Sequence, residues 1–520
     1  MTAPGATPSS MPPGIRRAMV TICSMTATIM QALDTTIANV ALPYMQGSLS
    51  ATQDQINWVL TSYIVAAAIM TAPVGWITSR FGRKRIFIAC AAGFTVASVM
   101  CGLAQDITQM VLARLLQGVF GAALVPLSQS VMLDAYSLQE RAKAMSLWGA
   151  GVMMGPIMGP SLGAWLTEAY SWHWVFFVNL PFGIFTVVGL LIFTDETPKN
   201  TALRFDWFGF AALAIAIGAV QLALDRGEQL GWMESNEILA EFIVAGVGFY
   251  YFLAHSLTTS HPFIRFELFR DRNFLSGCIF MAVMGVVLFS TMALASPLLQ
   301  NVMGYPILTA GILLASRGFG TLISFMMVSR LMQHFEARTL ILAGLLITCI
   351  SLWFMSGWTD QTGAIEIAVV SIVQGYSFGL VFSPLSTAAF LTLPNQLRTD
   401  GTAMLTLMRN VASSVGIAIV IGQLTEGTRR NHAMLVEHIN PFNHALQMPS
   451  LRSVIDLSTN AGKAMMERIV NLQAQILSFS RDELLILIFI LCTLPMAFMI
   501  SSTRASLQNR TAVPPQAAKD

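Results

Sequence analysis

Apolar runs long enough to cross a membrane follow one another along the whole chain. The hydrocarbon core of a bilayer is about 30 Å thick and requires about 20 apolar residues in one helix. Short polar segments separate these runs. The pattern predicts an all-α, polytopic membrane protein. We expect fourteen transmembrane helices, at 18–38, 57–78, 86–104, 108–133, 144–166, 175–194, 207–224, 237–257, 274–298, 308–330, 339–357, 364–392, 402–424 and 483–503.

The composition supports a membrane protein and excludes several other classes. Hydrophobic residues make up 55% of the 520 residues and charged residues 11%, whereas globular domains average about 45–50% and about 25%. A net charge of +2 provides no basic surface for nucleic acid. The six cysteines lie inside apolar runs, without C-x-x-C or zinc-type spacing. We therefore expect packing roles for the cysteines and no metal site.

Basic residues are concentrated on alternate polar segments. Four of them share the segment GWITSRFGRKR, whereas Arg226 is the one basic residue in the short segments of the other set. Short loops rich in Lys and Arg stay on the cytoplasmic side of a membrane. The bias predicts that both terminal tails, 1–17 and 504–520, are cytoplasmic.

The longest polar segment runs from Thr425 to Arg481 and is expected on the outer side. Within it, the stretch AGKAMMERIVNLQAQIL predicts an amphipathic helix. This apolar stripe either docks a partner or caps the outer mouth of the bundle. The stripe consists of Met466, Ile469, Val470, Ile476 and Leu477.

Two charged residues fall inside apolar runs at similar expected depth. With the first span running outward and the fourth inward, Asp34 lies about 14 Å and Arg114 about 12 Å from the outer end of its helix. An ionised side chain at mid-bilayer costs roughly 2.5–3.5 kcal/mol, so those present usually face a cavity or a partner. Arg114, Gln117, Gly118 and Gly121 share one helix face, which gives this helix a side typical of a cavity lining.

These charges allow two interpretations. In one, Asp34 exchanges a proton with an aqueous cavity, while Arg114 tunes its proton affinity or holds it when substrate is absent. In the other, the two residues form a permanent structural ion pair. We favour the functional interpretation, with Arg317 and Arg409 as weaker cavity candidates. Arg409 is close enough to the expected cytoplasmic face for its long side chain to reach water.

The fifth span contains a ladder of small residues in GAGVMMGPIMGPSLGAWL. Glycines four residues apart let another helix approach backbone to backbone, and prolines remove helix hydrogen bonds and bend a helix. The ladder suits a hinge or seal, and plain tight packing is the alternative. Its residues are Gly151, Gly155, Pro156, Gly159, Pro160 and Gly163.

The segment between the second and third spans combines a tight turn with crowded positive charge. Such cations can bridge to helix C-termini and to an acid at the inner end of the fourth span. Simple retention of positive charge in the cytoplasm would need no further role. The residues concerned are Gly75, Ser79, Arg80, Gly82, Arg83, Lys84 and the acid Asp134.

Together these stretches resemble the major facilitator superfamily, and within it the fourteen-span drug:proton antiporters of the EmrB type. LDTTIANVALP is similar to the first-helix motif of that subfamily, with Asp34 as its proton-linked aspartate. GWITSRFGRKR is similar to the superfamily loop motif, LARLLQGVFGA to the fourth-helix motif with Arg114, and GVMMGPIMGPSLG to the antiporter motif. WHWVFFVNLPFG, LDRGEQLGWMES, LQNVMGYPILTAGI and INPFN extend the likeness.

The resemblance implies an architecture and a set of partners. It implies a six-helix bundle at 18–194, an inserted helix pair at 207–257 and a second six-helix bundle at 274–503, which includes the outer loop 425–481. The bundles would alternate access to a central site. It also implies the bacterial inner membrane, coupling to the proton gradient without a cofactor, a periplasmic adaptor and an outer-membrane channel.

The chain departs from the family pattern at two positions. Ser79 stands where the loop motif usually has an acid that joins Arg83 and Asp134, so one leg of an inner latch is missing. His173 stands where an arginine is common.

Export of lipophilic or amphipathic compounds, driven by protons, is therefore the leading function. The chain has no G-x-x-x-x-G-K-[ST] loop for ATP, and no H-E-x-x-H or serine elbow, so we expect a transporter rather than an enzyme. The alternative is a transporter of the same fold for an endogenous metabolite, siderophore or lipid. A scaffold or receptor ranks third, because it has no need of buried charges beside a glycine-rich helix.

Overall fold

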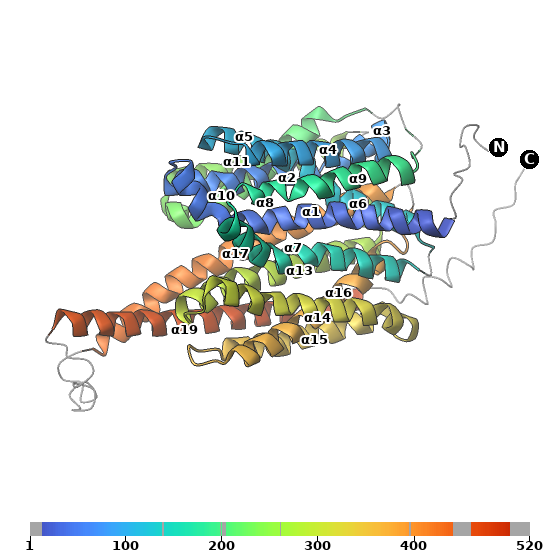
Figure 1. The fold of residues 1–520 in the computed structure, drawn as a ribbon. Coiled ribbons are helices and arrows are strands. Elements are labelled where there is room, and N and C mark those ends of the chain that lie inside the picture. The colour runs from blue at the N-terminus through green and yellow to red at the C-terminus, as the bar shows by residue number, and fades with distance from the viewer. Residues whose placement is uncertain are drawn as a thin grey trace, which may run out of the picture. The chain divides into compact units, whose positions relative to one another are not determined.

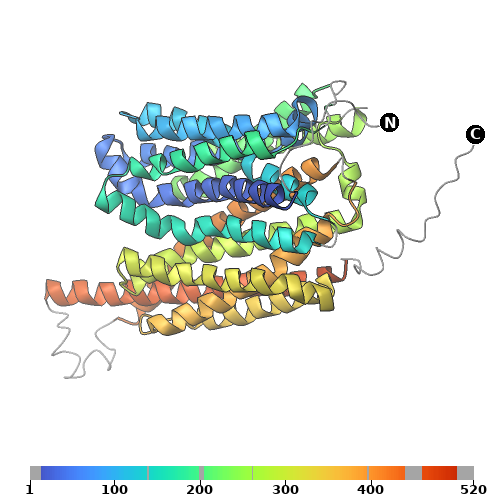
Figure 2. The same ribbon diagram turned by 45° about the vertical axis from the view of Figure 1, so that its right-hand side comes forward.

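The computed structural model describes residues 13–137, 140–197, 199, 204–259, 262–394, 397–439 and 459–499. The terminal tails and the centre of the expected outer loop lie outside these residues. Within them the chain is helical and contains no strand. It divides into two compact units. Figures 1 and 2 show the ribbon from two directions.

Unit 1 comprises 1–211, 254–265 and 394–406. The helix α1 packs along α6, α7 and α9, while α4 packs on α5 and α9, and α2 on α5 (Figure 1). Its helices are α1 (Pro13–Ser48), α2 (Gln53–Thr71), α3 (Val74–Phe81), α4 (Arg83–Gly102), α5 (Ile107–Gly121), α6 (Leu124–Ala135), α7 (Arg141–Ala169), α8 (Trp174–Phe177) and α9 (Asn179–Phe193).

Unit 2 comprises 212–253, 266–393 and 407–520. The helix α16 packs on α13, α14 and α15, and α15 also packs on α19. Its elements are η1 (Trp232–Glu234), α12 (Glu267–Arg270), α13 (Arg272–Pro297), the π-helical turn η2 (Leu298–Val302), α14 (Ile307–His334), α15 (Ala337–Ser356), α16 (Ala364–Ala389), α19 (Asn460–Thr493) and η5 (Leu494–Met499). Three helices pass from one unit to the other: α10 (Trp207–Leu230), α11 (Asn236–Thr258) and α17 (Arg398–Glu437).

Ten helices in the described part of the chain are long and apolar enough to cross a membrane, and the number rises to eleven if a bent pair forms one span. The bent pair is α2 with α3, whose axes differ by 57°. Pro73 lies at this break, and proline cannot donate the backbone hydrogen bond that a continuous helix requires. The helices α1, α7 and α19 are also long, at 36, 29 and 34 residues, but fall outside the apolar set. The count of fourteen spans therefore remains a prediction.

The segment expected as an outer loop is largely helical where it is described. The helix α17 continues to Glu437, and α19 begins at Asn460. In Figures 1 and 2, α19 extends beyond the ends of α14 and α15. Asn431 joins the two long helices by donating to Ser478 Oγ at 3.0 Å and to the Ala474 carbonyl at 3.4 Å. The predicted amphipathic stripe thus lies in the first part of α19, and the same helix continues into the segment expected as the last span.

Candidate functional site: a buried polar network in unit 1

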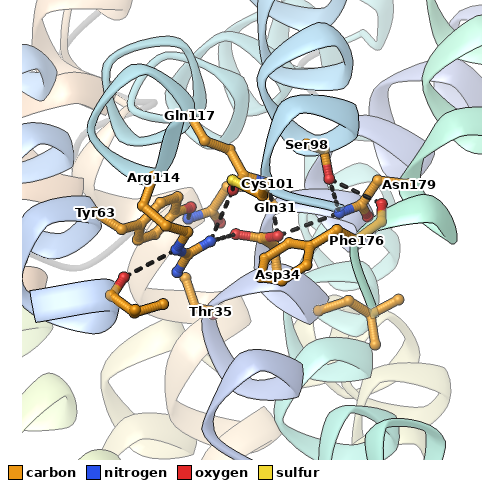
Figure 3. Close-up of polar contacts among 12 residues, drawn as sticks. Gln31, Asp34, Thr35, Tyr63, Ser98, Cys101, Arg114, Gln117, Phe176 and Asn179 are labelled. Carbon is orange, nitrogen blue, oxygen red and sulfur yellow. Dashed lines mark hydrogen bonds and ion pairs between the residues drawn. The ribbon is translucent and has the colours of Figure 1, made fainter. Parts of the chain in front are cut away.

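Asp34 lies at the centre of unit 1, with no surface exposed to solvent. It belongs to α1, which is packed on several sides by α6, α7 and α9. An ionised carboxylate in such surroundings requires a cation and several hydrogen-bond donors. The structure supplies both (Figure 3).

The cation is Arg114 on α5, which is 1% exposed. Its Nη1 donates to Asp34 Oδ2 at 2.6 Å, and its Nε donates to the Val59 carbonyl at 3.0 Å. The guanidinium also lies 4.2 Å from the centre of the Tyr63 ring, a distance typical of a cation–π contact. Asp106 caps the start of α5 by accepting a hydrogen bond from the Gln109 backbone. A capped and tightly packed helix therefore holds Arg114 in place.

Two amides complete the carboxylate's hydrogen bonds. Gln117, one turn after Arg114, donates to Asp34 Oδ1 at 2.7 Å and accepts from Arg114 Nη1 at 2.8 Å. Asn179, the first residue of α9, donates to the same Oδ1 at 3.2 Å and to Ser98 Oγ at 3.0 Å. Asp34 thus accepts hydrogen bonds from three side chains of two other helices.

Sequence reasoning found three members of this network and missed a fourth. The structure brings Asp34, Arg114 and Gln117 together, as their expected depths required. Asn179 was not selected, although it lies in the motif WHWVFFVNLPFG. A buried amide inside an apolar run is the signal that could have found it, because such a group requires partners.

The small-residue face of α5 is occupied by a neighbouring helix. A Cβ on Gly118 would collide with the Tyr63 backbone carbonyl, and one on Gly121 would lie 3.1 Å from the Tyr63 hydroxyl. This face therefore packs against α2 instead of lining an open cavity. Asp34 likewise has no surface exposed to solvent.

The other two arginine candidates lie in unit 2 and do not belong to this network. Arg317 on α14 is 6% exposed, and its Nη1 donates to Thr291 Oγ1 at 3.1 Å. Arg409 on α17 is partly exposed, and its nearest polar contact is the adjacent Asn410 Oδ1 at 3.4 Å. The sequence had made these arginines cavity candidates only because they lie inside apolar runs.

The glycine ladder of α7 packs against the part of α1 that carries Asp34. A Cβ on Gly155 would collide with the Ala32 backbone, and one on Gly159 with the Thr36 side chain. Thr36 Oγ1 donates to the Gly155 carbonyl at 3.0 Å. A Cβ on Gly163 would lie 3.0 Å from Ile37, whereas one on Gly151 would have only ordinary contacts at 3.7 Å. The helix continues through Pro160 and through Pro156, whose side chain lies outside the described residues.

The ladder therefore provides close packing beside the carboxylate. Whether it also hinges stays a prediction.

The loop-motif residues form an ion-pair group at one end of unit 1. Arg83 Nη1 donates to Asp134 Oδ2 at 2.6 Å and to Ser130 Oγ at 2.9 Å. Asp134 Oδ1 accepts from Arg398 Nη1, on the first turn of α17, at 2.7 Å. Thr399, the next residue, hydrogen-bonds with Ser130 at 3.0 Å. The start of α17 is thereby tied to α4 and α6.

The remaining loop-motif residues shape this end of the unit. Gly75 lies directly against the Asp400 side chain, so that any Cβ would clash. Gly82 has a φ of 97°, a conformation that glycine adopts readily. Lys84 Nζ donates to the Leu191 carbonyl at 2.8 Å, and Arg80 lies 6.0 Å from the Trp76 ring centre. Neither ion pair to Asp134 involves Ser79.

A bundle of apolar helices around a sealed, charged network is typical of secondary transporters rather than of enzymes. Residues 24–417 match the family model described as the Major Facilitator Superfamily. The chain belongs to this superfamily of multi-pass membrane transporters.

Curated relatives narrow the comparison. The chain is 33% identical over 433 residues to the multidrug export protein EmrB of Escherichia coli strain K12, covering 83% of this chain and 84% of EmrB. It is 31% identical over 436 residues to the fatty acid resistance protein FarB of Neisseria gonorrhoeae, covering 83% and 86%.

Solved structures agree with the fold. The human organic anion transporter MFSD10 matches with a TM-score of 0.57 at 11% identity, covering 92% of this chain and all of that one. A bacterial homologue of the human lysosomal transporter Spinster, inward-facing and unoccupied, matches with a TM-score of 0.53 at 19% identity, covering 95% and 98%. At these identities the likeness concerns the fold alone.

Proposed function

We propose that this chain exports lipophilic or amphipathic compounds across the bacterial inner membrane in exchange for protons. The observation that carries the proposal is the fully buried Asp34, paired with Arg114 at 2.6 Å. Curated relatives named for multidrug export and fatty acid resistance support the substrate class. The protein needs no cofactor in this scheme, because the proton gradient supplies the energy.

The network gives protonation a mechanical effect. A proton on Asp34 cancels the negative charge, so Arg114 loses its counter-ion while Gln117 and Asn179 lose a charged acceptor. Hydrogen bonds to an ionised group are roughly twice as strong as those between neutral groups. Protonation therefore weakens the attachment of α1 to α5 and α9, and loss of the proton restores it. Alternating access would give the sealed carboxylate its route to water.

The ion-pair group around Asp134 is proposed as the inner latch of this cycle. The helix α17 begins in unit 1 and continues into unit 2. The ion pair of Arg398 with Asp134 therefore anchors the first turn of this helix in unit 1. Ser79 occupies the position that is usually acidic in the motif. The ion pair between Arg398 and Asp134 compensates for the interaction that this acid would have made.

Both termini are proposed to be cytoplasmic. This orientation places the C-terminal part of α17 and the N-terminal part of α19 in the periplasm. There Met465 and Ile469, one turn apart on α19, are 45% and 40% exposed. We propose this surface as the contact for a periplasmic adaptor, which would in turn join an outer-membrane channel.

Met465→Asp combined with Ile469→Asp should abolish co-purification of the adaptor, while Glu467→Gln on the opposite face of the same helix should not. Retained binding in the double variant would refute the assignment.

Proton-driven transport in inverted membrane vesicles tests the central proposal. Wild type, Asp34→Asn and the exposed-loop control Asp360→Asn would be compared on a panel of dyes, drugs and fatty acids with an imposed proton gradient. Wild type and the control should accumulate substrate only with the gradient, and Asp34→Asn should not respond to it. Gradient-independent uptake by wild type, or an unimpaired Asp34→Asn, would contradict the mechanism. Uptake confined to a metabolite, siderophore or lipid would favour the alternative substrate class.

A further inference from the structure

Unit 2 contains a buried acidic residue that the sequence pattern did not single out. Glu483 on α19 is 2% exposed, and its Oε2 has no hydrogen-bond partner among the described residues. The adjacent Asp482 is also 2% exposed, and its Oδ2 likewise has no partner in that part of the chain. An ionised carboxylate is rarely buried without donors, because it has lost its hydration without replacement.

Unit 2 also contains a buried cation that does not bind this acid directly. The guanidinium of Arg317 and the carboxyl of Glu483 interact electrostatically, yet no ion pair joins them among the described residues. Arg317 donates once, to Thr291, while its Nε and Nη2 have no partner there. Arg317 thus has donors without an acceptor in the same unit in which Glu483 has an acceptor without a donor. In unit 1, by contrast, Arg114 and Asp34 are in direct contact at 2.6 Å.

The two residues lie at matching heights in unit 2. Arg317 is about 26 Å from the end of α14 at His334, and Glu483 is about 27 Å from the end of the 3-10 helix η5 at Met499. The start of α15, which follows α14, is at the same end as η5, because Arg338 lies 4.1 Å from the Phe498 ring centre. The charges therefore share one layer of the bundle.

A third helix adds an unsatisfied polar side chain to this layer. Gln374 on α16 is 5% exposed, and neither of its side-chain polar atoms has a partner among the described residues. The next residue, Gly375, packs directly against the Arg317 carbonyl. Native interiors leave few polar groups unsatisfied, so this concentration on three helices marks a site whose bonding changes during the protein's function.

Other ionisable groups lie on the elements that contact α19. The helix α17 contacts α19 through Asn431, and its nearby Arg429 and Arg430 both pair with Glu426. The other elements packed on α19 are α13, α15, η2 and η5, and their ionisable residues are Arg272, Arg338, Cys278 and Cys349. Both arginines lie in the first turn of their helices, at the far end from Glu483. On α19 itself Arg481 is exposed and Asp482 is the neighbouring acid. Two adjacent carboxylates disfavour joint ionisation, which favours a proton on this pair.

We propose that Glu483 is a second proton-binding residue of this transporter and that Arg317 is the cation it engages on losing its proton. In the conformation described here the carboxyl is neutral and stands apart from Arg317. Release transfers H⁺ to water, leaves a carboxylate, and changes the combined charge of the two side chains from +1 to zero. The inference rests on the proposed proton coupling and extends it to two protons, one in each unit.

Infrared pH-difference spectroscopy of the reconstituted protein tests this without a known substrate. The carbonyl stretch of protonated carboxylic acids reports buried titrating acids directly. Wild type should show separate contributions from Asp34 and Glu483, and Glu483→Gln should lose one of them. Glu483→Asp, which keeps an acid, should retain a shifted signal. The exposed Glu467→Gln on the same helix should match wild type. A Glu483→Gln spectrum identical to that of wild type would overturn the proposal.

Transport stoichiometry separates this inference from the proposed function. With a transported dye from the panel, Glu483→Gln should halve the number of protons exchanged per dye molecule. If Asp34→Asn abolishes gradient-driven transport while Glu483→Gln keeps the wild-type ratio, only the second proton site fails. If Asp34→Asn is unimpaired, the proposed function itself fails, whatever the result at Glu483.

Discussion

Asp34 and Arg114 meet at 2.6 Å, with side chains that are 0% and 1% exposed. Removing one partner of a buried ion pair leaves an uncompensated charge, whereas removing both can be nearly neutral. The contribution of the pair to stability should therefore be tested separately from its proposed transport role.

A double-mutant comparison measures how strongly Asp34 and Arg114 depend on each other for stability. Asp34→Asn and Arg114→Gln should each lower the free energy of unfolding in detergent, by about 3–5 kcal/mol, because each strands one buried charge. The double variant should recover most of that loss and still lack proton-driven transport. Thermal unfolding and vesicle transport provide the two measurements. Additive losses in the double variant would show that the two side chains do not act as a pair.

The glycine ladder offers a matched pair of substitutions. Gly155→Ala should destabilise the protein by about 1–3 kcal/mol and impair transport, because its Cβ would collide with the Ala32 backbone. Gly151→Ala should be tolerated, because a Cβ there meets its nearest neighbours at 3.7 Å. Thermal unfolding and dye efflux would be measured for both. Equal behaviour of the two variants would argue against close packing of α7 on α1.

The proposed inner latch, the ion-pair group around Asp134, can be weakened by a substitution at Arg398. Arg398→Gln removes one of the two arginines bound to Asp134 and should expose the first turns of α17 more often. Ala403, which is 3% exposed in the buried cluster of unit 1, provides the reporter. In a chain without native cysteines, Ala403→Cys should react several-fold faster with a maleimide when Arg398→Gln is present. The exposed Arg204→Gln is the control, and unchanged labelling in the Arg398 variant would refute the latch.

His173 predicts a pH dependence of stability. Burial lowers its pKa below the ordinary value of 6.5, and the ring stacks on Trp172 at 3.7 Å and hydrogen-bonds with Ser171 at 3.2 Å. The unfolded chain therefore binds a proton more readily, so the free energy of unfolding should fall as the pH drops below about 6.5.

His173→Gln should reduce this loss and leave stability near pH 8 little changed. Melting temperatures at pH 8 and pH 5.5 provide the measurement, with the exposed His334→Gln as control. An equal acid-side loss in wild type and His173→Gln would exclude this histidine as its source.

The local pattern of the chain determined the fold class and much of the unit 1 site. Apolar runs of bilayer length can only be helices, because each helix satisfies its own backbone hydrogen bonds where water is absent. Asp34 and Arg114 were identifiable because lipid penalises unpaired charge, and their similar expected depth was consistent with contact between them. The glycine ladder of α7 similarly predicted a close contact with another helix.

Only the tertiary structure decided which polar groups share a layer and which stand apart. Asn179 completes the carboxylate site although 145 residues of chain separate it from Asp34, and Arg398 reaches Asp134 across 264 residues. Glu483 lies at the edge of an expected span, where its burial could not be read from hydropathy. The physical reason is that hydropathy measures the preference of each segment for lipid, whereas pairing depends on helix rotation and contact between distant segments.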